Sequence, residues 1–117
     1  MREITTTDVL EILLDDEAPS ALVFKHSTRC PISAAALRRV EEWERGAGAD
    51  APPVWMVRVI EQRPLSNLIA ERTGVAHQSP QAMLIRGGRV LWHASHNAVG
   101  GEAIDRAIRA AGPETSA

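Results

Sequence analysis

The residue in this sequence best suited to chemistry is Cys30, the only cysteine of the 117-residue chain. It stands in the segment KHSTRCPIS, residues 25–33, and Pro31 follows it directly. Because proline is favoured at the first position of a helix, we expect Cys30 to lie where a strand gives way to a helix. The positive end of a helix favours the thiolate, the nucleophilic form of cysteine. The alternative is that Cys30 is a small, inert residue of the core.

Ser33 limits the reactions that are open to this thiol. Dithiol oxidoreductases carry the motif C-x-x-C, in which the second cysteine resolves the mixed disulfide formed by the first. Here the motif is C-P-I-S, and a serine cannot attack a disulfide. Cys30 can therefore accept a small thiol from a mixed disulfide, but it needs an external thiol to be released. The Ser33 hydroxyl either donates to the thiolate or serves as an ordinary polar group at the start of the helix.

A second candidate feature is Pro80, in the segment His77-Gln-Ser-Pro-Gln. An X-Pro bond is usually trans, since only about 5–6% of such bonds in folded proteins are cis. In a fold with the order of elements described below, however, the proline before the final hairpin is where a cis bond is expected. Such a bond would place the backbone of Ser79 beside Cys30, ready to pair with a peptide-like ligand as an added strand.

The elements that must position these residues alternate between helical and strand patterns. We expect helices from a cap at Thr7-Asp8, from Pro31 to a stop near the Gly46-Ala-Gly48 linker, from Pro64 to a cap at Gly74 and over 102–111, and strands over 21–24, 54–59, 82–85 and 90–92. Gly87-Gly88 has the sequence of a tight hairpin turn. The two early strands should pair in parallel, because a helix separates them. The sequence thus predicts an α/β fold: a mixed four-stranded sheet, with two parallel strands and a terminal antiparallel hairpin, covered by helices on both faces.

Length and composition set further limits. A chain of this length suits a single domain over 1–117, with a frayed tail at 112–117. The net charge is −2 and charges of both signs are interspersed, which argues against binding of nucleic acid or of an anionic membrane surface. The sequence has no apolar run near the ~20 residues that span a bilayer, and no signal-peptide pattern. With one cysteine and no export signal, we expect a cytoplasmic protein.

The C-P-x-S thiol, the proline before the hairpin and this order of elements together resemble the thioredoxin-like fold. More narrowly, they resemble the YtxJ-like monothiol bacilliredoxins. The residues that carry the resemblance are FKHSTRCPISA (24–34), EQRPLSNLIAE (61–71), GVAHQSPQ (74–81) and VLWHASH (90–96). The resemblance covers nearly the whole chain. It implies a bacterial enzyme that removes bacillithiol from S-bacillithiolated client proteins, and whose thiol is regenerated by bacillithiol, a partner redoxin or a reductase.

The resemblance also implies roles for particular residues. Cys30 would be the catalytic residue and bacillithiol a co-substrate, with no tightly bound cofactor. We expect these residues to bind the substrate: Lys25, His26, Thr28, Arg29, Pro31, Ser33, Ser79 and Pro80. Arg29 stands where many relatives carry threonine, and we hypothesise that it either lowers the pKa of the thiol further or binds the malate carboxylates of bacillithiol. No metal site is expected, because His77, His93 and His96 lack a recognisable ligand spacing.

A non-enzymatic binding module is the alternative interpretation. In one version, Cys30 and an external thiol hold an iron–sulfur cluster across a dimer, although Pro31 stands where the cluster-binding class carries glycine. In the other version, the fold presents a peptide-binding groove and Cys30 is only a redox sensor.

Overall fold

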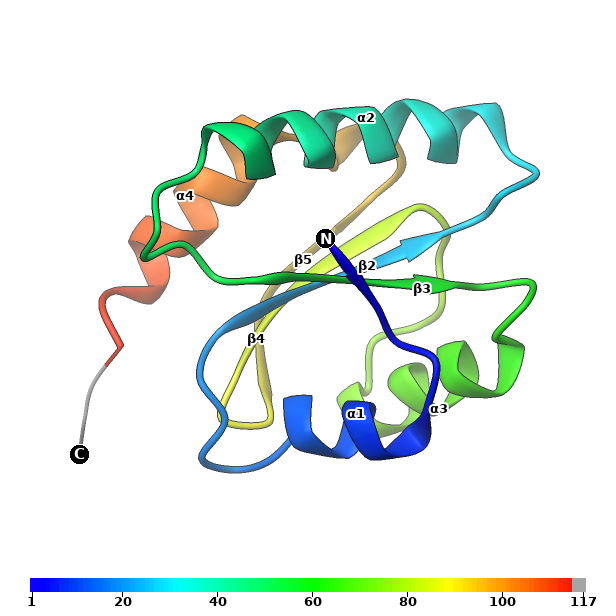
Figure 1. Ribbon diagram of the computed structural model, residues 1–117, viewed down its shortest axis with the longest axis horizontal. Coiled ribbons are helices and arrows are strands. Elements are labelled where there is room, and N and C mark those ends of the chain that lie inside the picture. Colours follow the sequence, from blue (N-terminus) through cyan, green and yellow to red (C-terminus); the bar gives the residue numbers. More distant parts are fainter. Residues whose placement is uncertain (115–117) are drawn as a thin grey trace.

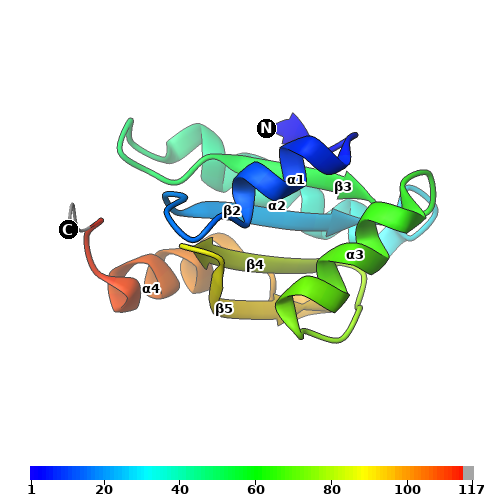
Figure 2. The ribbon, with the colours of Figure 1, turned by 90° about the horizontal axis from the view of Figure 1, so that it is seen from below.

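The computed structural model describes residues 1–114 and shows a five-stranded sheet with helices on both faces (Figure 1). In chain order the elements are β1 (Arg2–Glu3), α1 (Thr7–Leu13), β2 (Ala21–His26), α2 (Pro31–Gly46), β3 (Val54–Arg58), α3 (Arg63–Thr73), β4 (Gln81–Arg86), β5 (Arg89–Ser95), a 3-10 turn (His96–Ala98) and α4 (Gly101–Ala111). The strand order across the sheet is β1-β3-β2-β4-β5. Helices α2 and α4 cover one face, and α1 and α3 cover the other (Figures 1 and 2). No helix among the described residues is long and apolar enough to cross a membrane.

The additional strand, β1, corrects the expected number of four strands. Arg2 and Glu3 pair in parallel with Trp55 and Met56 of β3, and the Ile4 amide donates to the Met56 carbonyl over 2.8 Å. Two paired residues are too few to show the alternation that marks a strand in sequence. The other pairings agree with the prediction, since β2 and β3 are parallel and β4 and β5 are antiparallel.

Strand β2 lies at the centre of the sheet and separates two apolar cores. Leu22 and Phe24 point toward α2 and α4, whereas Val23 points toward α1 and α3. This alternation follows from the two-residue period of a strand. All six residues of β2 are buried, including Lys25 and His26 at its carboxyl end. The carboxyl end of β2, directly before the loop that carries Cys30, therefore holds two buried polar side chains.

The hairpin turn between β4 and β5 depends on its two glycines. Gly87 and Gly88 have φ angles of 58° and 76°, which side chains disfavour. A Cβ atom on Gly88 would also lie only 2.8 Å from the Leu14 carbonyl oxygen. The predicted tight turn is thus present, and it packs closely against the end of α1.

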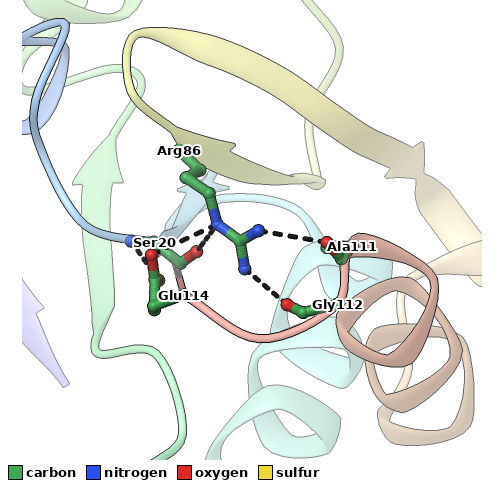
Figure 3. A network of polar contacts seen from close by, with 5 residues as sticks. All are labelled: Ser20, Arg86, Ala111, Gly112 and Glu114. Atoms are coloured by element: carbon green, nitrogen blue, oxygen red, sulfur yellow. Dashed lines mark hydrogen bonds and ion pairs between the residues drawn. The ribbon is translucent and has the colours of Figure 1, made fainter. Parts of the chain in front are cut away.

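Arg86, at the end of β4, holds the first part of the tail that we expected to fray, residues 112–117 (Figure 3). Its guanidinium donates to the Gly112 carbonyl over 2.8 Å and to the Ser20 hydroxyl over 2.7 Å. The Glu114 carboxylate lies 3.3 Å from the same guanidinium and accepts from the Ser20 amide over 2.7 Å. The chain is thus tied down as far as Glu114, and the last three residues lie outside the described part.

Candidate active site

Cys30 is the N-cap residue of α2, as the sequence predicts. Its backbone is extended, with φ −116° and ψ 120°, and Pro31 occupies the first turn of the helix. The Cys30 carbonyl accepts from the Ala34 amide over 3.0 Å, and its own amide donates to the Ser27 carbonyl over 3.4 Å. The residue is partly exposed and unpaired with another cysteine. The thiol is therefore accessible at the positive end of a 16-residue helix, where negative charge is favoured.

Ser33 fixes the loop that carries the thiol. It is fully buried, and its Oγ atom accepts from the Ser27 amide over 2.9 Å and lies 2.8 Å from His26 Nδ1. The His26 ring stacks on Phe24, and burial is the main cause that lowers the pKa of this histidine. A neutral His26 with its proton on Nε2 accepts the Ser33 hydroxyl proton at Nδ1. Of the two roles left open by the sequence, these contacts support the structural one.

Thr28 and Arg29 lie on the exposed side of the thiol loop. The Thr28 hydroxyl donates to Glu61 Oε2 over 2.9 Å, so the loop is tied to the segment that precedes α3. The pKa of Glu61 is lowered, first by a hydrogen bond from its own amide and then by the Thr28 hydroxyl, with smaller effects of the charges on Arg58 and Arg29. Arg29 therefore stands at the surface within electrostatic reach of a carboxylate, next to the thiol in the chain.

Lys25 occupies the opposite face of β2 from His26, and it is fully buried. Its Nζ atom donates to the Ser66 carbonyl in α3 over 3.0 Å and lies 3.1 Å from His77 Nδ1. Burial lowers the pKa of Lys25 to about 8. Lys25 and Ser33 have no exposed surface, and their side chains contact other groups of the protein. That these two residues bind a substrate stays a prediction.

The Ser79-Pro80 peptide bond is cis. Pro80 is buried directly before β4, and its carbonyl accepts from the His96 amide over 2.9 Å. In the register of β2 and β4, Gln81 is opposite Lys25, so the cis bond lies at the same end of the sheet as the thiol loop. Ser79 Oγ is enclosed and has no hydrogen-bond partner among the described residues.

Three residues at this end of the molecule were not recognised as site residues from the sequence. They are Glu61, Ser66 and His77, which contact Thr28 and Lys25 from 33, 41 and 52 residues away. Their only signal was their presence in the segments 61–71 and 74–81 that carry the family resemblance. Ile32 was also overlooked, although it is 48% exposed and places an apolar surface beside the exposed Pro31. No group of three metal-ligating side chains is present within residues 1–114.

Comparisons with known proteins agree with this architecture. The family model described as "Monothiol bacilliredoxin BrxC" matches residues 2–104. A solved structure described as "A putative oxidoreductase with a thioredoxin fold" is 30% identical, has a TM-score of 0.78 and is matched over 91% of both chains. Thioredoxin from Fasciola hepatica is 16% identical, with a TM-score of 0.68 and coverage of 94% of this chain and 98% of that one. Human ERp44, in a zinc-bound form, is 21% identical, with a TM-score of 0.65 over 94% of this chain and 31% of its own. The last two show similarity of fold alone.

Proposed function

The chain belongs to the monothiol bacilliredoxin BrxC family, and on this premise we propose that it removes bacillithiol from S-bacillithiolated proteins. Family membership and the thioredoxin fold support a thiol-disulfide oxidoreductase. The observation that carries the finer proposal is the position of Cys30, a partly exposed N-cap thiol whose i+3 neighbour is a buried serine. Such a thiol can accept a small thiol but cannot expel it without help.

The first step is attack by the Cys30 thiolate on the bacillithiol sulfur of the client's mixed disulfide. The disulfide bond between client and bacillithiol breaks as the bond between Cys30 and bacillithiol forms. The client cysteine leaves as a thiolate and takes up a proton from water. The amide groups of the first turn of α2 stabilise negative charge on Cys30 before the attack.

The second step regenerates the enzyme with an external thiol. A bacillithiol thiolate attacks the bacillithiol sulfur bound to Cys30, which forms oxidised bacillithiol and releases the Cys30 thiolate. A partner redoxin could supply this thiolate instead, and a reductase would then reduce the resulting disulfide. The cytoplasm, where thiols are kept reduced, is the compartment that this cycle requires.

Exposed residues around Cys30 suit the recognition of such substrates. Arg29 offers a guanidinium to the carboxylates of bacillithiol, and Pro31 and Ile32 offer apolar surface to a client protein. Ser79, beside the cis bond to Pro80, offers backbone groups to an extended client segment. No tightly bound cofactor is needed, because both steps exchange one disulfide for another.

Recovery of a blocked enzyme tests this proposal. A test enzyme is inactivated by bacillithiol on its catalytic cysteine, and its activity is followed after addition of free bacillithiol with the wild-type protein or the Cys30→Ser variant. We expect catalytic amounts of the wild-type protein to accelerate recovery and the variant to have no effect. Recovery at the rate given by bacillithiol alone would overturn the proposal.

A further inference from the structure

Lys25 is the only lysine among the 13 lysines and arginines of the chain, and it is the one buried most completely. An arginine cannot release its proton and carries a wide planar head, whereas lysine tolerates enclosure by lowering its pKa. Its hydrogen-bond partners in the described part of the chain are the Ser66 carbonyl and His77 Nδ1, both uncharged acceptors. The cluster of Lys25, Ser66 and His77 thus holds positive charge without a carboxylate bonded to it.

The contact with Lys25, together with the Ser66 hydroxyl 3.3 Å from the same nitrogen, decides which nitrogen of His77 carries the proton. An ammonium group has three donors and no acceptor, so His77 Nδ1 must accept at the 3.1 Å contact. The ring proton therefore stays on Nε2. Burial, then the positive charges of Lys25 and Arg63, lower the pKa of His77, which keeps the ring neutral. His77 is exposed, and its Nε2 atom has no hydrogen-bond partner within residues 1–114, so the Nε2–H group can donate outward.

His77 lies at the end of the sheet that carries the thiol. It precedes the cis Ser79-Pro80 bond by two residues, and its partner Lys25 lies five residues before Cys30 at the end of β2. The start of α3, the connection into β4 and the start of α2 gather at this same end (Figure 1). The His77 Nε2–H group is a neutral donor that lies near positive charges, which suits a negatively charged acceptor. A carboxylate is the strongest acceptor of this kind in small thiols.

We propose that His77 is a substrate-binding residue whose Nε2–H group donates to a carboxylate of the small thiol transferred to Cys30. Lys25 is then a positioning residue, which fixes the tautomer and the direction of the ring from inside the protein. The inference rests on the proposed function and extends it, because it assigns the preference for a carboxylate-bearing thiol to particular side chains.

Two substitutions of His77 separate its inward and outward contacts. In His77→Asn the side-chain oxygen can replace Nδ1 as the acceptor for Lys25, but no donor reaches the position of Nε2. In His77→Gln the amide nitrogen reaches that position and keeps the outward donor. Each variant is given a test protein modified with bacillithiol or with an analogue that lacks the malate group, and the ratio of the two transfer rates to Cys30 is measured.

We expect the wild-type protein to prefer bacillithiol, and His77→Asn to lower the ratio of rates about tenfold, as for one hydrogen bond to a charged group. His77→Gln should retain most of the preference. An unchanged ratio in His77→Asn would overturn the inference, as would an equal loss in His77→Gln. Failure of the proposed function looks different, since the wild-type protein would then transfer neither thiol faster than a free thiol does.

The positioning role of Lys25 has its own spectroscopic signature. In protein labelled with ¹⁵N-histidine and carrying Ser66→Ala, so that the Ser66 hydroxyl no longer reaches the ring, we expect His77 to show a bare Nδ1 and a protonated Nε2, and the further change Lys25→Met to produce a mixture of tautomers. The same single tautomer in Lys25→Met would contradict the positioning role.

Discussion

Ser33 Oγ lies 2.8 Å from His26 Nδ1, and it occupies the position that holds the second cysteine in a dithiol oxidoreductase. It also accepts the Ser27 amide over 2.9 Å, so the polar group at this position binds the thiol loop to β2. In a C-x-x-C protein that position supplies the group that resolves mixed disulfides. In this chain it bonds the loop to its neighbours, and the chain has no second cysteine that could resolve a mixed disulfide at Cys30.

Ser33→Ala should therefore lower the stability of the whole protein as well as remove hydrogen bonds that hold the thiol loop. The change leaves the Ser27 amide and His26 Nδ1 without their shared partner, and a buried unsatisfied polar group costs about 1–3 kcal/mol. We expect a loss of that size in the free energy of unfolding, measured with urea. Thr5→Ala removes an exposed hydroxyl and serves as the control. A Ser33→Ala variant as stable as this control would contradict the assigned hydrogen bonds.

Lys25 should make stability depend on pH in the alkaline range. Its pKa is about 8 in the folded protein and 10.5 in the unfolded chain, so between these values the unfolded chain binds the extra proton. The free energy of unfolding of the wild type, relative to Lys25→Met, should then rise from pH 8 to 10.5 by up to about 3 kcal/mol. Below pH 8 the full cost of burying the ammonium is present.

The composition of the chain limits the other side chains that titrate in the same pH range as Lys25. The chain has no tyrosine, Lys25 is its only lysine, and the comparison can be made in a Cys30→Ser background. Urea unfolding of both variants at several pH values gives the difference directly. If the two curves run parallel across this range, the lowered pKa of Lys25 is refuted.

Arg86 should stabilise the protein without affecting thiol exchange. It donates to the carbonyls of Ala111 and Gly112 and to Ser20 (Figure 3). It lies at the far end of β4 from the thiol loop, since Gln81 at the start of this strand is opposite Lys25. We expect Arg86→Ala to lower the free energy of unfolding by about 1–3 kcal/mol, since each hydrogen bond from a charged group contributes appreciably.

Arg89→Ala is the matched control. It removes an exposed arginine at the start of β5, on the other side of the hairpin turn from Arg86. Transfer rates at Cys30 should be the same in both variants under conditions where both are folded. A slower transfer in Arg86→Ala alone would show that the two ends of the sheet are coupled, contrary to this account.

Arg29 should accelerate reaction with bacillithiolated substrates. Its exposed guanidinium adjoins Cys30 in the chain, and attraction between exposed charges is weakened by salt. We expect Arg29→Thr to slow transfer about two- to fivefold at low ionic strength, with a smaller difference at high salt. Arg38→Thr changes an exposed arginine further along α2 and controls for net charge. Unchanged kinetics in Arg29→Thr would exclude a role for this side chain in binding bacillithiol.

Local patterns were sufficient to predict much of this fold. Pro31 marked the start of α2 and placed Cys30 at its N-cap, Gly74 ended α3, and Gly87-Gly88 formed the hairpin turn. Each of these is a property of a few neighbouring residues. Strand β1 was missed because two residues show no periodicity, and its pairing is set by β3, more than 50 residues away.

The candidate site was less predictable for the same physical reason. Lys25 looks like a surface cation in the sequence, and only the packing of α3 and the segment before Pro80 encloses it. The partnership with His77 joins residues 52 positions apart, which no local pattern reveals. Ser33 was recognised as the residue that excludes dithiol chemistry, but its bond to His26 depends on the buried face of β2.

The central claim, that Cys30 accepts bacillithiol from a client protein, is tested most directly by intact-mass spectrometry. The wild-type protein and Cys30→Ser are each mixed with a bacillithiolated test protein, and the mass of one bacillithiol is followed over time. This role of Cys30 predicts rapid transfer of that mass from the test protein to the wild type and none to Cys30→Ser. Transfer to the wild type no faster than to a simple thiol would contradict it.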